Sequence, residues 1–390
     1  MNLLFVKERL AWPRSSGHDV HCYHMMRALS HAGHDVSLAT LHNPEPEAVD
    51  NAGLESIHHL TDYDSHEEPL ALTKTQERFR SYWGAPVGTI KQVARLSRDL
   101  QAQAVIVVGI NVLPYLAAVK NAIRVWYAGD ESVLHHLSQF QCWDPSTWRN
   151  LKQAAVQGLY ERTFRSILDR VWMVSKADRT AYQWVTGFRN VDVLPNGIDN
   201  EYYAPIDVPV IPRSCIFWGR LDFGPNIQAL QWFCHKVWPG IRRRIPDASF
   251  TICGFQPTHA VDQLIKNDQG VTLLANLPDI RTHVARHEVV VLPFVSGGGI
   301  KNKLLEAAAM GKAIVCSPRT VRGLTCGDAV ARAARARHWA PELAHLWRSA
   351  ERRAQLGSAA RRWVVEQHTW ESTANRAADA LRSTVSETIS

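Results

Sequence analysis

The sequence lacks long hydrophobic runs, internal repeats and low-complexity segments. Nowhere do about 18 apolar residues follow one another, which is the length that a membrane-spanning helix needs. Residues 1–7 contain no basic segment before an apolar stretch, so we interpret them as a first β-strand and not as a signal peptide. No repeat of 20–50 residues is visible, which excludes a solenoid or propeller. A globular chain is expected.

The cysteines form no C-x-x-C pair, and several of them lie in apolar, strand-like runs. This pattern is typical of reduced core residues in a cytoplasmic protein and argues against disulfides and zinc ligands. The seven cysteines are Cys22, Cys142, Cys215, Cys234, Cys253, Cys316 and Cys326.

Familiar nucleotide and metal motifs are also missing. No G-K-[ST] sequence closes a Walker loop, and no G-x-G-x-x-G follows the first predicted strand, which argues against a nicotinamide dehydrogenase. His18, His21 and His24 are spaced three apart but have no supporting carboxylate or cysteine. Asp62-Tyr63-Asp64 lies in an acidic stretch that we interpret as a surface turn. We therefore predict no metal site and no cofactor.

What is present is a regular alternation of short apolar runs with helical patterns. The chain has 390 residues, 46% of them hydrophobic and 21% charged, which suits two domains with separate cores. Apolar runs of four to six residues separated by helices predict parallel sheets covered on both faces, hence two doubly wound α/β domains. The predicted strands are 3–6, 36–40, 104–108, 124–128, 171–175, 191–194, 215–219, 249–254, 271–274, 289–293 and 313–316.

The join between the two domains is predicted at 200–212. The turn sequence Asn196-Gly197-Ile198-Asp199 precedes it, and Pro205, Pro209 and Pro212 interrupt any periodic pattern. This gives an N-terminal domain over 1–199, a C-terminal domain over 200–369 and an amphipathic C-terminal helix over 370–390. Packing of that helix back on the N-terminal domain is one arrangement to test.

Positive charge is concentrated in the second half of the chain. Residues 1–200 carry a net charge of −1 and residues 201–390 a net charge of +8. Such a basic half suits anionic partners, including nucleotide phosphates, acidic lipid headgroups and nucleic acid. We interpret the Ala/Arg-rich run 332–362 as surface helices, with weak contact to a membrane surface as the alternative.

The most informative segment is 293–311. An apolar strand ends at Pro293, the glycines 297–299 follow, and a predicted helix begins near Lys301. Free N–H groups and the positive end of the helix dipole make such a turn an anion site. Lys301 and Lys303 add full charges, and Glu306 lies where a carboxylate would meet the ribose of a bound nucleoside diphosphate.

Taken together, the motifs resemble the family 4 retaining glycosyltransferases of the GT-B fold, and among them the bacterial exopolysaccharide sugar transferases. The resemblance extends over nearly the whole chain. It is carried by Gly17, Gly33-His34-Asp35-Val36, Val174-Ser175-Lys176-Ala177-Asp178, Leu194-Pro195-Asn196-Gly197-Ile198-Asp199, Phe217-Trp218-Gly219-Arg220-Leu221-Asp222, Pro225-Asn226, Lys303-Leu304-Leu305-Glu306-Ala307 and Trp370.

The resemblance implies two Rossmann-like domains facing across a cleft, with the donor on the second domain and the acceptor on the first. It implies that Gly17, with His18 beside it, approaches the donor diphosphate and that Arg220 binds it. The family's lysine a few residues after this arginine is absent, and Lys301 or Lys303 is the candidate replacement. The first of the two glutamates usual in the family is also missing, because Gly298 stands there. The backbone of Gly298 and Gly299 is the candidate substitute.

The end of the strand 124–128 supplies the candidate that would act on the acceptor. Gly129-Asp130-Glu131-Ser132 follows it, and relatives place a His or Asp here beside the transferred sugar. Asp130 could orient the acceptor hydroxyl or take its proton. The alternative is an Asx turn in which Asp130 or Ser132 caps the next helix.

The resemblance therefore implies a retaining, metal-independent glycosyltransferase of polysaccharide biosynthesis. Asp130, Arg220 and Lys301 are the predicted catalytic residues. The partners would be a nucleotide-sugar donor and a glycan, lipid-linked or small-molecule acceptor. A cytoplasmic location follows, with peripheral contact at the inner face of the plasma membrane as an option. Two alternatives are a non-hydrolysing nucleotide-sugar epimerase and a basic nucleic-acid-binding protein, although no nucleic-acid module is visible.

Overall fold

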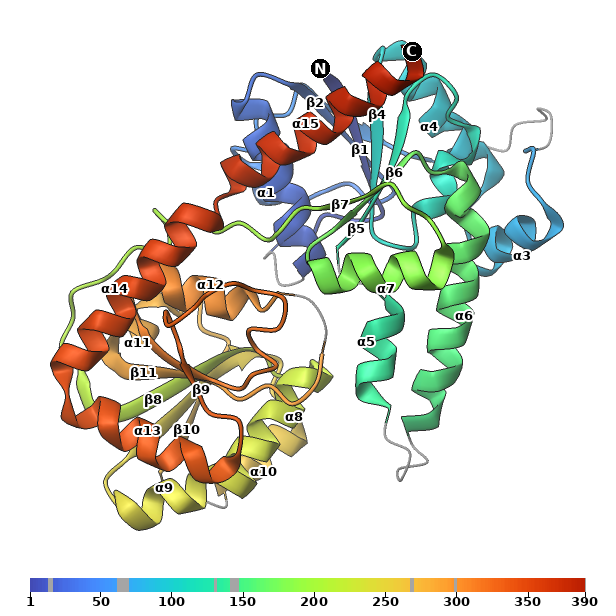
Figure 1. Cartoon of the computed structure of the whole chain (residues 1–390). Helices are drawn as coiled ribbons and strands as arrows, with labels where there is room; N and C mark the ends of the chain where they lie inside the picture. Colours follow the sequence, from blue (N-terminus) through green and yellow to red (C-terminus); the bar gives the residue numbers. More distant parts are fainter. Residues whose placement is uncertain are drawn as a thin grey trace. The chain divides into compact units, whose positions relative to one another are not determined.

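The computed structural model describes residues 1–12, 17–61, 70–129, 132–140, 147–266, 270–297 and 300–389. It divides into two compact units (Figure 1). The first unit comprises Met1–Asn196 together with Trp370–Ser390, and the second comprises Gly197–Thr369. The chain therefore returns to the first unit for its last helix.

The first unit is a seven-stranded parallel sheet with the strand order β3-β2-β1-β4-β5-β6-β7. Its strands are β1 (Asn2–Lys7), β2 (Asp35–Thr40), β3 (Ser56–His59), β4 (Ala104–Val108), β5 (Ile123–Gly129), β6 (Arg170–Met173) and β7 (Val191–Val193). Its helices are α1 (Gly17–His31), α2 (Pro46–Val49), α3 (Lys74–Tyr82), α4 (Val87–Asp99), η1 (Leu113–Ala118), α5 (Ser132–Gln139), α6 (Trp148–Phe164), η3 (Arg165–Ile167), α7 (Lys176–Thr186) and α15 (Trp370–Ile389).

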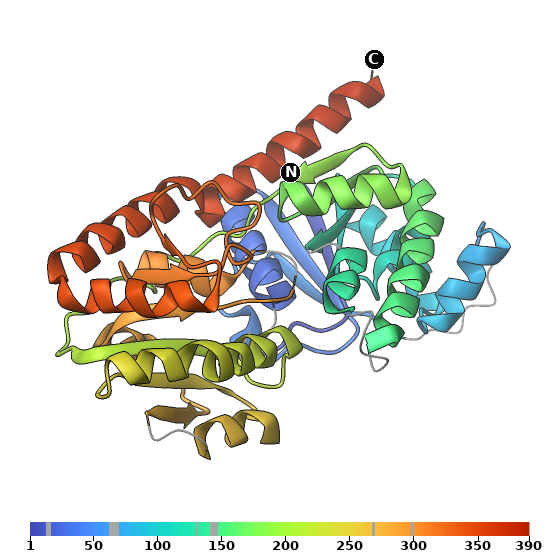
Figure 2. The ribbon, with the colours of Figure 1, turned by 60° about the horizontal axis from the view of Figure 1, so that its bottom comes forward.

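Both faces of this sheet are covered, as its continuous apolar strands predict. Alternate side chains of a strand point to opposite faces. Leu3 and Phe5 of β1 pack in one cluster with residues of α1 and α15, and Leu4 and Val6 pack in another with residues of α4, η1 and α6. Helix α15 lies beside α1 (Figure 1, Figure 2).

The contact between α15 and α1 is built around Trp370. Its indole ring stacks on His24 and meets His21 edge-on. His21 also forms a 2.6 Å hydrogen bond with the Tyr127 hydroxyl, and burial lowers the pKa of His21 to about 3. These contacts give His21 a packing role between α1, β5 and α15.

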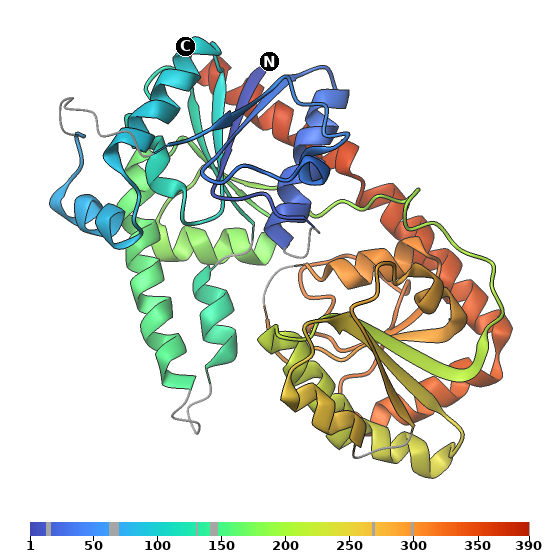
Figure 3. The ribbon, with the colours of Figure 1, turned by 180° about the vertical axis from the view of Figure 1, so that it is seen from behind.

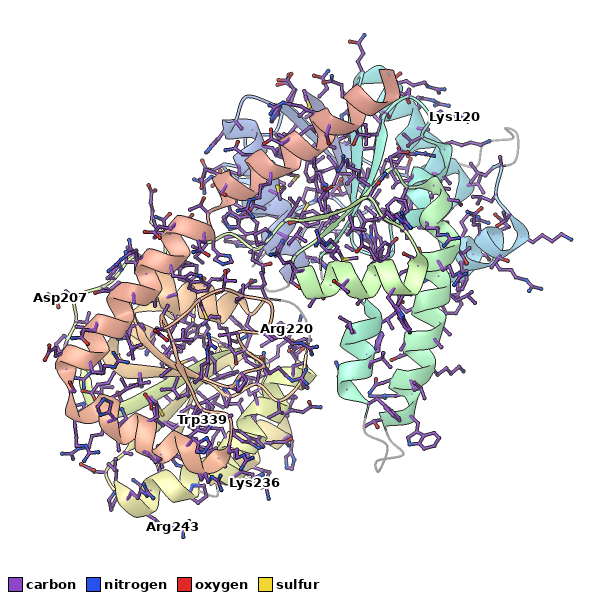
Figure 4. The ribbon with its side chains drawn as sticks, viewed as in Figure 1. Lys120, Asp207, Arg220, Lys236, Arg243 and Trp339 are labelled. Atoms are coloured by element: carbon purple, nitrogen blue, oxygen red, sulfur yellow. The ribbon has the colours of Figure 1, made fainter. Side chains whose placement is uncertain are left out.

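The second unit is a six-stranded parallel sheet with the order β10-β9-β8-β11-β12-β13, and helices lie on both of its faces (Figure 3). Its strands are β8 (Ile211–Arg220), β9 (Ser249–Phe255), β10 (Val271–Ala275), β11 (His287–Leu292), β12 (Ala313–Cys316) and β13 (Ala331–Arg332). Its helices are α8 (Gly224–Trp232), the π turn η4 (Phe233–Val237), α9 (Trp238–Arg244), α10 (His259–Lys266), α11 (Arg281–Arg286), α12 (Asn302–Ala309), α13 (Ala336–Arg348) and α14 (Ala350–Gln367). Trp339 is fully buried within this unit (Figure 4).

The fold class predicted from the sequence, two doubly wound parallel-sheet domains, is confirmed. The sequence prediction missed the edge strands β3 and β13, because β3 is half-exposed and β13 has only two residues. In the described part of the chain, no helix is long and apolar enough to cross a membrane. The six cysteines described there are free thiols, and five of them are buried.

Candidate functional site

The order of the strands marks one position in each sheet where a ligand is expected. In the first unit β2 lies on one side of β1 and β4 lies on the other side, so the direction in which strands are added reverses between β1 and β4. In the second unit the same reversal separates β8 from β11. Open parallel sheets bind ligands at the carboxyl ends of the strands that flank such a switch point. The candidate residues can be located against these two places.

Arg220 is the last residue of β8, so it lies at the switch point of the second unit. Its guanidinium donates to both oxygens of Asp222, from Nε to Oδ1 at 3.0 Å and from Nη2 to Oδ2 at 2.6 Å. This bidentate contact raises the pKa of Arg220 and lowers the pKa of Asp222. The side chain of Arg220 is 41% exposed, and it is labelled at the edge of the unit in Figure 4. It is charged and reachable from solvent.

The turn after Arg220 is held by the buried Asn226. Its side-chain nitrogen donates to the Arg220 carbonyl oxygen at 2.7 Å. Because α8 begins at Gly224, this hydrogen bond ties the start of the helix to the end of the strand. Asn226 thus fixes the backbone from which the Arg220 side chain projects.

Lys301 and Lys303 lie on either side of the first residue of α12 and gather over the same aromatic ring. Their ammonium nitrogens are 5.5 Å and 5.7 Å from the centroid of Phe294, and Lys303 is also 5.7 Å from that of Phe217. Such distances allow cation–π attraction. Burial lowers the pKa of Lys303 to about 8, although the nearby Glu306 acts in the opposite direction.

Gly219 makes room for Lys303. Its φ of +144° is one that side chains rarely permit, and a Cβ there would overlap Cε and Nζ of Lys303. Gly297, with φ +89°, similarly borders Lys301, whose Nζ lies 3.3 Å from the position that a Cβ would take. The two glycines therefore allow both ammonium groups to approach the carboxyl ends of β8 and β11.

Glu306 follows one turn of α12 after Lys303 and is fixed by Trp218. The indole Nε1 donates to Glu306 Oε2 at 2.7 Å. Burial raises the pKa of Glu306, while the hydrogen bond from Trp218 and the charge of Lys303 lower it. A carboxylate has about four acceptor positions, so Glu306 can still accept hydrogen bonds from ligand hydroxyls.

In the first unit, a cavity of about 250 Å³ lies at the switch point between β1 and β4. Its lining includes residues that follow β1, the start of α1 and residues 108–112 after β4. Lys7 Nζ and Asp19 Oδ1 form a buried ion pair 3.1 Å long. At the mouth, Asn111 donates to a Glu8 oxygen at 2.6 Å. These groups give the cavity both donors and acceptors with balanced charge.

Gly17 and His18 open helix α1 beside this cavity. A Cβ on Gly17 would meet no heavy atom of the described residues within 4 Å. The His18 Nε2 atom lies 3.1 Å from the Ala128 carbonyl oxygen, and its ring borders Gly129, whose φ is +73°. His18 is thereby held against the carboxyl end of β5.

In the second unit the structure places Arg220 at the end of β8 and brings Lys301, Lys303 and Glu306 together at the start of α12, and in the first unit it places Gly17 and His18 at the start of α1. Asp130, Glu131, Gly298 and Gly299 lie outside the described residues, as does Asp62-Tyr63-Asp64. Among the residues that are described, no group of three or more His, Cys, Asp and Glu side chains could hold a metal ion.

Sequence reasoning gave no role to Trp218, Asn226, Asp222 and the pair of Lys7 with Asp19. Trp218 and Asn226 both lie inside motifs named in the sequence analysis. The signal that could have identified them is a side chain with a polar atom, in an apolar strand for Trp218 and at the start of a helix for Asn226. Lys7 and Asp19 are twelve positions apart, and only the βα geometry brings them together.

Two sequence comparisons relate this chain to known proteins. Residues 212–348 match the family model described as glycosyl transferases group 1. A GDP-mannose-dependent alpha-(1-6)-phosphatidylinositol monomannoside mannosyltransferase of Mycobacterium tuberculosis is 26% identical over 245 residues. That alignment covers 55% of this chain and 62% of the relative, so the similar region is shorter than two thirds of the relative's length.

Solved structures match the whole fold. The crystal structure of HepE from Anabaena in complex with UDP has a TM-score of 0.69 at 12% identity, covering 98% of this chain and all of that chain. Sucrose-phosphate synthase from Thermosynechococcus elongatus has a TM-score of 0.72 at 14% identity, covering 99% of this chain and all of that chain. The fold is GT-B, with a glycosyltransferase group 1 match in the second unit.

Proposed function

We propose that this protein is a glycosyltransferase that moves a sugar from a nucleotide-diphosphate donor to an acceptor hydroxyl, with retention of anomeric configuration. The observation that supports the proposal is that Arg220 ends β8, while Lys301, Lys303 and Glu306 lie at the start of the helix that follows β11, within the region similar to group 1 glycosyltransferases. The three cations suit the diphosphate end of a nucleoside diphosphate, and the carboxylate suits the hydroxyls of its ribose.

In this proposal the cations bind the diphosphate and stabilise it as it leaves. Negative charge develops on the leaving group when the sugar–phosphate bond breaks, and preorganised cations stabilise that charge most strongly in the transition state. Glu306 accepts hydrogen bonds from the ribose hydroxyls. Because three cations already neutralise the diphosphate, we propose that the reaction needs no metal ion. Attack would occur on the front face of an oxocarbenium-like sugar, with the donor phosphate helping to remove the acceptor proton.

The acceptor would bind in the cavity of the first unit. Its volume of about 250 Å³ suits one sugar ring, and its paired charges suit neutral hydroxyls better than a free anion. We propose a donor-contacting role for Gly17 and His18 at the start of α1, and Asp130 would orient or deprotonate the acceptor. The mannosyltransferase relative acts on a lipid-linked acceptor, so we propose a glycan or lipid-linked acceptor, in polysaccharide biosynthesis on the cytoplasmic side of a membrane.

A thermal-shift screen against UDP, GDP, ADP and dTDP and their sugars tests the donor site. A ligand present at a hundred times its dissociation constant should stabilise the native state by about 2.7 kcal/mol. No stabilisation by any of these nucleotides would exclude the donor site. Sugar transfer from the donor so identified, assayed with simple glycoside acceptors, then separates transfer from hydrolysis or epimerisation.

Two further measurements test the mechanism. The proton coupling constant at the new anomeric centre, measured by NMR, reports whether the configuration is retained. Transfer should continue in excess EDTA. Complete loss of activity that Mg²⁺ or Mn²⁺ restores would overturn the proposal that Arg220, Lys301 and Lys303 suffice to neutralise the diphosphate.

A further inference from the structure

The hairpin of helices α5 and α6 carries an exposed apolar stripe that the donor and acceptor sites do not use. The two helices pack side by side and extend from the sheet of the first unit (Figure 1, Figure 3). In α6 the exposed apolar residues are Trp148, Leu151, Ala155 and Leu159. Their spacing of three or four positions places them on one face, over about 16 Å of helix at 1.5 Å per residue.

This stripe is opposite the face of α6 that packs on the protein. The buried residues Ala154, Gln157, Tyr160 and Phe164 occupy the other side of the helix. At the start of α6 the Phe140 ring meets Trp148 edge-on, and Leu137 of α5 is also exposed. The exposed apolar side chains therefore form one patch and are not needed for the core.

Positive charge accompanies the patch. Arg149, Lys152 and Arg162 are exposed on α6, whereas its only acidic residue, Glu161, is buried. Every exposed residue of α6 is thus neutral or basic. A helix with tryptophan and leucine on one face and flanking basic residues is typical of segments that lie in the plane of a bilayer interface.

We propose that the α5–α6 hairpin docks on an anionic lipid bilayer, with Trp148, Leu151 and Leu159 entering the interface and Arg149, Lys152 and Arg162 contacting acidic headgroups. Charge complementarity selects this occupant. In a symmetric pair of copies the same face of each copy meets the other. The three cations of one copy would then lie near the three cations of its partner, and the like charges would repel each other. An anionic surface satisfies the same cations.

The sequence-based hypothesis considered weak membrane contact only for the Arg-rich run 332–362, as the alternative to surface helices. In the structure the tryptophans Trp339, Trp347 and Trp363 of helices α13 and α14 are buried, and neither helix has an exposed large apolar side chain. Those helices can offer charge but no apolar surface to a bilayer. The hairpin offers both, and the inference holds whether or not the proposed transfer reaction is correct.

Co-sedimentation with vesicles tests the docking surface. The parent protein should bind vesicles of 30% phosphatidylglycerol in phosphatidylcholine and bind pure phosphatidylcholine far less. The triple variant Arg149→Gln/Lys152→Gln/Arg162→Gln should lower partitioning by roughly fivefold for each charge removed. The variant Trp148→Ser/Leu151→Gln/Leu159→Gln should lower it by at least about tenfold, since its apolar contribution is lost.

The matched control removes three exposed charges from the second unit, in Arg337→Gln/Arg352→Gln/Arg362→Gln, and should partition within about threefold of the parent. Each of the four proteins should give one cooperative thermal unfolding transition without ligand, which reports that it is folded. The proposal would be overturned if the parent protein did not bind anionic vesicles. It would also be overturned if either hairpin variant bound them as well as the parent. A dimer, seen by sedimentation equilibrium, that the apolar variant dissociates would overturn it as well, because a second copy would then occupy the stripe.

Discussion

The lowered pKa of Lys303 makes donor binding depend on pH in a direction that can be tested. Burial lowers this pKa to about 8, so the ammonium loses its proton as pH rises through that value. A diphosphate binds the charged form. Above about pH 8 the protein must take up a proton to bind, and affinity should fall by up to about tenfold per pH unit. Below about pH 7 the lysine is charged, and its contribution to affinity should be complete.

The substitution Lys303→Met keeps the length of the side chain and removes its charge. A charge-assisted hydrogen bond contributes about 1.5–3 kcal/mol, so at pH 7 the variant should bind the nucleoside diphosphate roughly 10- to 100-fold more weakly. At pH 9.5 the parent has lost most of this advantage, and the two affinities should approach each other. Isothermal titration calorimetry from pH 7 to 9.5, with the diphosphate selected by the thermal-shift screen, measures both curves.

Lys312 provides a matched control. Burial also lowers its pKa to about 8, but its Nζ donates to the Ala285 carbonyl oxygen, away from the proposed diphosphate site. The variant Lys312→Met should keep the pH dependence of the parent. A parent affinity that stays constant from pH 7 to 9.5, or a Lys303→Met variant that retains the same decline, would refute the role of Lys303.

Substitutions at three other positions test further site residues. Glu306→Ala should weaken nucleotide binding by about 1.5–3 kcal/mol while leaving the fold intact; unchanged affinity in calorimetry would rule out the contact with ribose. Arg220→Ala should weaken diphosphate binding and also slow single-turnover transfer, because its interaction strengthens in the transition state. Lysine at this position should restore only part of the loss, since it lacks the bidentate fork. Asp130→Asn should leave nucleotide affinity almost unchanged and lower turnover by about 10²-fold or more if Asp130 is a base; turnover equal to that of the parent would identify it as a helix cap.

The alternation of buried strands with helices was sufficient to predict the fold from the sequence. β4 is apolar throughout and β1 is apolar between its two end residues because both faces of these strands are covered, and this leaves a signal in a single sequence. The edge strand β3 is half-exposed and leaves none. The unit boundary in the structure lies at Asn196–Gly197, a few residues before the proline-rich segment that the sequence indicated.

The site was less accessible to sequence reasoning. The anion-binding character of residues 297–306 follows from local order, because glycines, lysines and a helix start are adjacent in the chain. The contacts that tune these groups come from other elements. Trp218 reaches Glu306 across 88 positions, and the space that Lys303 needs is provided by Gly219. Such contacts depend on the sheet register, which composition and spacing do not specify.

The return of the chain to the first unit has a consequence for biogenesis. Ala374, Ala377 and Leu381 of α15 are buried against the first sheet beside α1, and they leave the ribosome after the whole of the second unit. The second unit is continuous in sequence and has all its strands and helices once residue 369 has been made. The first unit, although its synthesis starts first, cannot cover its sheet until α15 has also been made. A nascent chain that has not reached α15 would expose that apolar face, so the first unit should complete its fold after the second.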